Sequence, residues 1–166
     1  MNDRVFIGID TGPQKSAKVA IKGDKVLYGY EVENHPLMND LMSDYSESVL
    51  AIEKFQGRGT ICTQDCYDSD WWCGVFVASW RGDSSPVLIY RSEVKSYLCG
   101  TTAANDSNVR QAIIDRYPRT GGGKTPQVGT KEQPGPLYGI SNHMWAALGV
   151  ALTAQAGEYG RCWLKI

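Results

Sequence analysis

A run of five residues near the start of the sequence, Val5-Phe6-Ile7-Gly8-Ile9, has four bulky apolar side chains and one glycine, and Asp10 follows it. A strand that does not alternate apolar and polar residues is typical of the middle of a sheet, where both faces are covered. The run therefore predicts a layered fold built around a buried central strand. Asp10 is expected at the carboxyl end of that strand.

The segments around this run predict the rest of the sheet. Residues 15–22 alternate polar and apolar side chains, and Gly23-Asp24 leads through a tight turn into residues 25–31. This pattern predicts three antiparallel strands in a meander. Residues 48–53 and 86–90 predict two more buried strands, which alternate with helical patterns and are therefore expected to pair in parallel. We predict an α/β fold with a mixed five-stranded sheet, three antiparallel strands then parallel strands, flanked by helices.

Helices are expected at 37–45, 65–80, 92–98, 107–117 and 142–156. Asp106 is the expected N-cap of the fourth of them. The helix over 65–80 places Trp72, Phe76 and Trp80 on one line and Trp71 beside it, so it has more apolar circumference than one sheet face can cover. Such a helix is either fully buried or part of a subunit interface.

The 24 residues 118–141 are rich in Gly, Pro, Lys and Thr and show no periodicity. A connection of this length is usually functional or disordered, and we expect a mobile loop. Within it, Gly121-Gly122-Gly123-Lys124-Thr125 resembles a phosphate-binding loop. That motif needs a glycine where Pro118 stands and a strand before it, so no nucleotide cofactor is expected.

Length and composition fit one globular domain over residues 1–166, with 42% hydrophobic residues and a net charge of −1. No stretch of 18 apolar residues and no signal-peptide core is present, so we expect a cytoplasmic protein that does not enter a membrane. The five cysteines suggest neither a disulfide framework nor a zinc site. Residues 91–131 carry seven basic and three acidic side chains, which fits either a solvated face or a phosphate-binding surface.

Two acids end predicted parallel strands, Asp10 after residues 5–9 and Glu53 after residues 48–52. On neighbouring strands they would face one crevice, where their charges repel unless a cation such as Mg²⁺ or Mn²⁺ lies between them. His143, at the start of the last helix, is a candidate metal ligand or general base. Each residue also has an ordinary interpretation, as a turn residue, a solvated carboxylate or a helix residue without a special role.

Along the chain occur the blocks Gly8-Ile9-Asp10-Thr11-Gly12, Ala51-Ile52-Glu53-Lys54-Phe55, Val94-Lys95 with Gly100 and Ala104, and the helix that begins Asn142-His143-Met144-Trp145. Together these blocks resemble the RuvC-type Holliday junction resolvases, a group with an RNase H-like fold. They span residues 5–155 in the order that the family has. The segments Glu93-Val94-Lys95-Ser96-Tyr97 and Gly135-Pro136-Leu137-Tyr138-Gly139 are similar to a phage-encoded branch of the group.

The resemblance implies a nuclease in which acidic residues bind two ions, Mg²⁺ or Mn²⁺, and a water attacks the phosphodiester. Asp10 would bridge both ions and Glu53 would bind one. The family's last helix supplies two acids three residues apart, and these positions fall near His143 and Ala146 here. His143 can serve as a ligand and Ala146 cannot, while Asn142 can contribute a carbonyl oxygen.

The resemblance also implies contacts with DNA. Lys95 matches a family lysine near the active site, and a second family lysine falls near Asp106 and is absent. Phe55 lies near an aromatic residue that stacks on a junction base, although it also fits an apolar loop anchor. Further DNA contacts are expected from Arg58, Lys124 and Lys131.

We therefore expect a resolvase of branched DNA, acting as a homodimer because two opposed strands must be cut. Its cellular setting would be the cytoplasm of a phage-infected or prophage-carrying bacterium. Two alternatives stay open: a nuclease of the same fold that cuts RNA–DNA hybrids or flaps, and a non-catalytic junction-binding protein.

Overall fold

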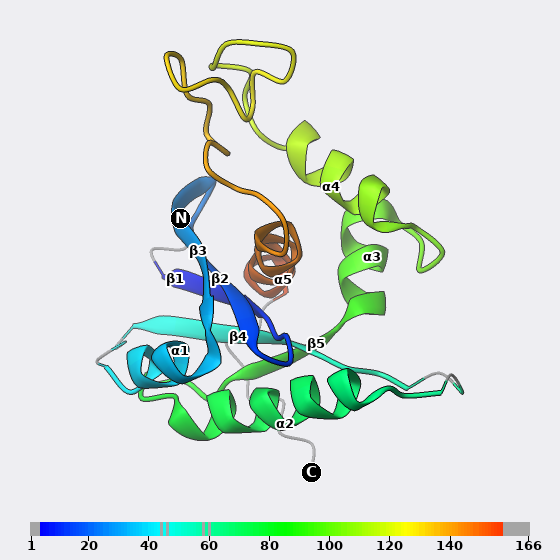
Figure 1. Cartoon of the computed structure of the whole chain (residues 1–166). Helices are drawn as coiled ribbons and strands as arrows, with labels where there is room; N and C mark the ends of the chain where they lie inside the picture. Colours follow the sequence, from blue (N-terminus) through cyan, green and yellow to red (C-terminus); the bar gives the residue numbers. More distant parts are fainter. Residues whose placement is uncertain (1–3, 44, 46, 58, 60, 158–166) are drawn as a thin grey trace.

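The computed structural model describes residues 4–43, 45, 47–57, 59 and 61–157. Five strands form one sheet in the order β3-β2-β1-β4-β5 (Figure 1). They are β1 (Val5–Asp10), β2 (Lys15–Lys22), β3 (Lys25–Glu33), β4 (Ser48–Lys54) and β5 (Val87–Tyr90). The central β1 pairs antiparallel with β2 and parallel with β4, and β4 pairs parallel with β5. The predicted mixed sheet is confirmed.

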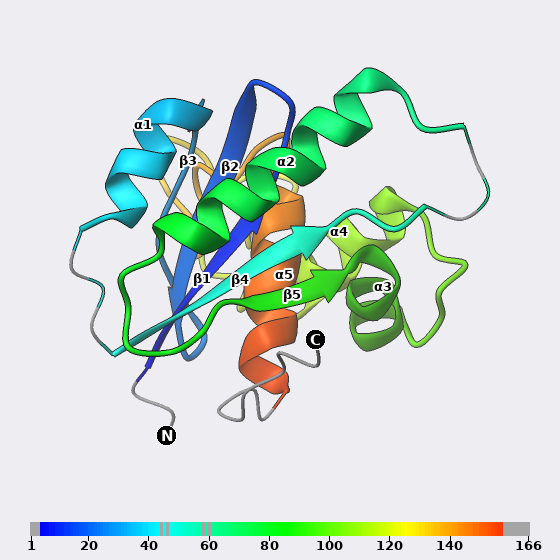
Figure 2. The ribbon, with the colours of Figure 1, turned by 90° about the horizontal axis from the view of Figure 1, so that it is seen from below.

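Five helices cover the sheet: α1 (Asn34–Leu41), α2 (Gln64–Ser79), α3 (Arg91–Cys99), α4 (Asp106–Asp115) and α5 (Met144–Ala156). Helices α1 and α2 lie on one face, and α5 lies on the other with α3 and α4 beside it (Figure 2). Each face has its own apolar core, which is why β1 has almost no exposed surface. Within the described residues, no helix combines the length and the apolar character needed to cross a bilayer.

The predicted starts of α1 and α5 and the predicted N-cap of α4 are wrong. Helix α1 begins at Asn34 and not after Pro36, because proline is tolerated in a first helical turn. Helix α4 begins at Asp106, and its N-cap is Asn105, whose side chain accepts a hydrogen bond from the Asn108 N–H at 2.9 Å. Helix α5 begins two residues later than expected, because Asn142 has a left-handed backbone (φ 44°) that no helix contains.

Gly8 determines how α5 lies on the sheet. A Cβ atom at this position would overlap the carbonyl oxygen of Ala147, so only glycine lets the helix approach β1 this closely. Asp10 is two residues after Gly8 along the strand, and His143 is four residues before Ala147 along the helix. The contact at Gly8 therefore sets the first turn of α5 beside the end of β1.

Helix α2 has aromatic side chains on both of its sides. Trp72 and Phe76 are buried against the sheet, as predicted, together with Trp80 just beyond the helix end. Tyr67 and Trp71 point outward, and each is 62% exposed. The helix is therefore not fully buried.

The segment 118–141 contains none of the named helices or strands, but it folds back on itself through backbone hydrogen bonds. Gly121 and Gly122 donate to the carbonyl oxygens of Pro126 and Gln133, and Leu137 donates to that of Gln127. Leu137 is fully buried in the core on the α5 side. Figure 1 shows this segment, coloured yellow to orange, beyond the end of α4.

One buried charge lies between β2 and α1. Lys18 is 1% exposed, and its Nζ donates hydrogen bonds of 2.5 Å to the Asp40 carboxylate and to the Tyr45 hydroxyl. The Tyr45 ring also lies 4.4 Å from this ammonium group. Burial lowers the pKa of Lys18, and the ion pair with Asp40 compensates in part.

Candidate active site

The sheet register places three acidic residues in one row at its carboxyl edge. Asp10 pairs with Ala17 of β2, and Ala17 pairs with Glu31 of β3. On the other side of β1, Ile9 pairs with Ile52, so Asp10 and Glu53 are the next residues on two adjacent parallel strands. Strands lie about 4.8 Å apart, so Asp10 and Glu53 are immediate neighbours. The predicted juxtaposition of these two acids is confirmed.

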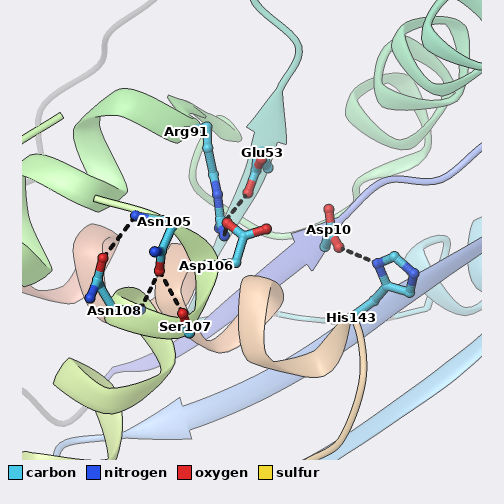
Figure 3. A network of polar contacts seen from close by, with 8 residues as sticks. All are labelled: Asp10, Glu53, Arg91, Asn105, Asp106, Ser107, Asn108 and His143. Atoms are coloured by element: carbon cyan, nitrogen blue, oxygen red, sulfur yellow. Dashed lines mark hydrogen bonds and ion pairs between the residues drawn. The ribbon is translucent and has the colours of Figure 1, made fainter. Parts of the chain in front are cut away.

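The first half of the site joins Asp10, His143 and Glu31. The Nδ1 atom of His143 lies 3.1 Å from Oδ2 of Asp10 (Figure 3). Oε1 of Glu31 accepts a hydrogen bond of 3.0 Å from the backbone N–H of His143. Ala17, which lies between the two acids in the row, is small enough to leave room for this arrangement. The start of α5 is therefore held from two strands at once.

The second half of the site joins Glu53, Arg91 and Asp106. Arg91 donates from Nη1 to Oε2 of Glu53 at 3.3 Å and from Nη2 to Oδ1 of Asp106 at 2.6 Å (Figure 3). Arg91 is the first residue of α3, directly after β5, which pairs with β4 at Glu53 and Lys54. The guanidinium thus bridges the end of β4 and the start of α4.

Burial and charge set the ionisation of these carboxylates. Desolvation raises the pKa of Glu53 to about 7, although Arg91 opposes the increase, and the nearby Asp10 adds to it. Desolvation also raises the pKa of Asp10, while His143 and Arg91 act in the opposite direction. The hydrogen bond from Arg91 lowers the pKa of the more exposed Asp106. Burial thus disfavours the ionised forms of Asp10 and Glu53, and a bound cation would favour these forms.

Both halves line one open cleft of about 680 Å³. Its lining residues come from the sheet edge, α3, α4 and the start of α5: Asp10, Glu31, Glu53, Arg91, Asp106, Val109, Arg110, Asn142, His143, Trp145 and Ala146. A smaller hollow of about 200 Å³ shares Asp10 and Glu53 and is also lined by Phe55. Ala146, at the position where the resemblance leads one to expect an acid, lies in the cleft and offers no ligand.

The other predicted site residues lie at different distances from this cleft. Asn142 lines it, and Lys95 of α3 is near enough to Asp106 to lower the pKa of that carboxyl. Lys124 and Lys131 are exposed on the segment 118–141 and do not contribute to the lining. Arg58 lies outside the described residues.

Three residues of the site were missed by sequence reasoning. The sequence pattern predicts Glu31 only as a strand residue, Arg91 only as part of a basic segment, and Asp106 only as a helix cap. A signal for Asp106 was available, because Asn105 before it is an equally good cap. Glu31 and Arg91 give no local signal, since only the strand order brings them to the carboxylates.

A divalent ion is suited by the donors present here, which are carboxylate oxygens with one imidazole and one amide residue. In the part of the chain that the structure describes, however, no three acidic, histidine or cysteine side chains are grouped closely enough to hold a metal ion. The polar contacts are made in two groups instead: Asp10 contacts His143, and Arg91 bridges Glu53 and Asp106.

A mixed sheet with this strand order and with helices on both faces is an RNase H-like α/β fold. Within that class the fold is RuvC-like. RuvC from Thermus thermophilus superposes with a TM-score of 0.59 at 17% identity, covering 91% of this chain and 93% of that chain. T. thermophilus RuvC in complex with Holliday junction substrate gives a TM-score of 0.57 at 18% identity, covering 92% and 93%. The sequence matches no protein-family model and no curated protein sequence.

Proposed function

We propose that this protein is a structure-selective endonuclease that hydrolyses phosphodiesters at four-way (Holliday) or branched DNA junctions with Mg²⁺ or Mn²⁺. The observation that carries the proposal is the placement of Asp10 and Glu53 at matched ends of adjacent parallel strands, facing one cleft with His143. That a RuvC of the same fold has been solved with a Holliday junction substrate supports branched DNA as the ligand class.

In this proposal Asp10 and Glu53 hold the ion from the sheet, and His143 and Asn142 hold it from the start of α5. A divalent ion held there would supply a water of lowered pKa and would offset charge on the phosphate; the resemblance implies two ions. Asp10 orients the imidazole through Nδ1, which leaves Nε2 of His143 to take a proton or a ligand. Glu31 fixes the backbone from which that imidazole extends.

The DNA is expected to cross the cleft along α3 and the start of α4. Lys95 would contact a phosphate, and Phe55, which is 41% exposed beside Asp10 and Glu53, would stack on a base. Lys124 and Lys131 would reach more distant backbone from the segment 118–141, and Arg58, outside the described residues, stays a predicted DNA contact. A phage origin and a cytoplasmic setting belong to the same proposal.

A junction has two-fold symmetry, and cutting two opposed strands requires two active sites related in the same way. The exposed side of α2, with Tyr67 and Trp71, is the proposed dimer surface. It lies on the face of the sheet opposite to α5 (Figure 2), so pairing there leaves the core behind the active site unchanged.

The substrate class is tested by incubating the purified protein, with Mg²⁺ or Mn²⁺, with end-labelled DNA of equal length and different shape. The set contains a four-way junction, a flap, an RNA–DNA hybrid and a linear duplex. We expect paired cuts in the junction and little cleavage of the duplex. Preferential cutting of the hybrid or the flap would assign the site to a different nuclease activity, and junction binding without cleavage would indicate a non-catalytic protein.

A further inference from the structure

The guanidinium of Arg91 occupies the place between Glu53 and Asp106. It donates to one oxygen of each carboxylate, and its side chain is 26% exposed, so it is accessible from the cleft. A guanidinium has five N–H donors, and two of them are used here. The remaining donors can meet a phosphate oxygen that enters the cleft, a partner that the planar fork of arginine suits well.

The backbone on both sides of this bridge is held in place. Arg91 is the first residue of α3, where the Glu93 carboxylate accepts a hydrogen bond of 2.7 Å from the N–H of Tyr90. Asp106 is the first residue of α4, where Asn105 and Asn108 exchange side-chain and backbone hydrogen bonds (Figure 3). The capped starts of α3 and α4 therefore hold the Arg91 guanidinium and the Asp106 carboxylate next to each other.

The charge of the cleft also suggests a single ion. The cleft has four carboxylates, those of Asp10, Glu31, Glu53 and Asp106, and two guanidiniums, those of Arg91 and Arg110. These six side chains in their ionised forms leave a balance of two negative charges, which one divalent ion neutralises. Arg110 cannot take the role of Arg91 at Glu53, because its guanidinium lies over the Trp145 ring, 4.8 Å from the centroid.

We propose that Arg91 is the second cation of this active site: the protein takes one divalent ion, held by Asp10, Glu53 and His143, and the guanidinium between Glu53 and Asp106 supplies the second positive charge. This inference rests on the proposed nuclease function. Hydrolysis joins the water oxygen to phosphorus and breaks the bond to the 3′-oxygen, which leaves with the electron pair and gains a proton from solvent. Arg91 stabilises the charge on the phosphate oxygens and is itself unchanged.

The test measures how many Mn²⁺ ions each chain binds in the absence of DNA. Mn²⁺ binding to the full chain is titrated by electron paramagnetic resonance of the free ion, at one fixed pH, for wild type, Arg91→Met and Arg91→Lys. Arg116→Met is the matched control, because Arg116 is a surface arginine of the same region that contacts Tyr97 and not the cleft. Circular dichroism on each sample establishes that it is folded.

We expect wild type, Arg91→Lys and Arg116→Met to bind one Mn²⁺ per chain and Arg91→Met to bind two, because Glu53 and Asp106 then lack a counter-ion. Junction cleavage should fall roughly 100-fold or more in Arg91→Met and recover in part in Arg91→Lys. Two ions in wild type, or one ion in Arg91→Met, would overturn the proposal. If wild type cuts no junction but the ion counts are as expected, the proposed function fails and the assignment of Arg91 as the second cation of the cleft survives.

Discussion

Glu53 is a carboxylate whose ionised form the fold opposes, since desolvation raises its pKa from 4.5 to about 7. The folded chain therefore binds this proton more tightly than the unfolded chain does. The stabilising contribution of protonated Glu53 is fully present below pH 4.5 and is lost as the pH rises through about 7.

Glu53→Gln tests this directly, because glutamine keeps the shape and does not titrate. We expect the free energy of unfolding of wild type, relative to the variant, to decrease by on the order of 2–3 kcal/mol between pH 4.5 and pH 8. The measurement is urea denaturation in EDTA at several pH values. Asp10 titrates in both proteins, so it does not account for the difference. A constant difference across this range would mean that Glu53 is not desolvated.

Glu31 positions His143 by accepting a hydrogen bond from its backbone N–H. We predict that Glu31→Ala slows junction cleavage by roughly 10-fold, as expected for a group that orients a ligand, whereas Glu31→Gln keeps most of the activity because its amide oxygen can accept the same hydrogen bond. Mn²⁺ affinity, measured in parallel, should follow the same order. Equal losses in both variants would show that the charge of Glu31 matters, and not its hydrogen bond.

At the scale of elements, α2 has a buried side and an exposed aromatic side, and the exposed side is the proposed dimer surface. We predict that Trp71→Glu turns a wild-type dimer into a monomer at micromolar concentration, because a charge there is desolvated on pairing. Sedimentation velocity provides the measurement, and Tyr138→Glu, at an exposed tyrosine of the segment 118–141, is the control. A dimer that persists in Trp71→Glu would place the interface elsewhere.

The segment 118–141 and α3 carry the lysines assigned to DNA backbone. Neutralising Lys95, Lys124 or Lys131 should weaken junction binding at every sequence. Each phosphate contact that is lost should reduce the log–log salt slope by roughly 0.9. Binding titrations at several salt concentrations measure the slope, and an unchanged slope would make these lysines a solvated surface only.

The strands were predictable because their evidence is local. The apolar run of β1 and the turn at Gly23-Asp24 determine strand positions, and the strand ends then bring Asp10 beside Glu53. Lys18 shows the limit of this reasoning. The alternating pattern of β2 predicts that Lys18 faces solvent, but α1 covers that side of the strand, and Asp40 of α1 forms an ion pair with Lys18.

At the scale of the whole molecule, the site combines six parts of the chain that lie apart in the sequence. Asp10 is in the central β1, Glu31 is in β3 two strands away on one side, and Glu53 is in the adjacent β4 on the other side. Arg91 at the start of α3, Asp106 at the start of α4 and His143 before α5 complete the cleft. No sequence pattern specifies that α4 returns to the cleft. This is why Asp10, Glu53 and His143 were identified from sequence, whereas Glu31, Arg91 and Asp106 needed the structure.

The central claim is that the cleft at Asp10 hydrolyses branched DNA, and the variant Asp10→Asn tests it most directly. Its amide keeps the shape of the carboxylate and removes the charge that a divalent ion needs. Cleavage of a labelled four-way junction and binding of the same junction are measured side by side with wild type. We predict that cleavage falls by roughly 1,000-fold while binding is unchanged or tighter. Cleavage by Asp10→Asn at the wild-type rate would contradict the account.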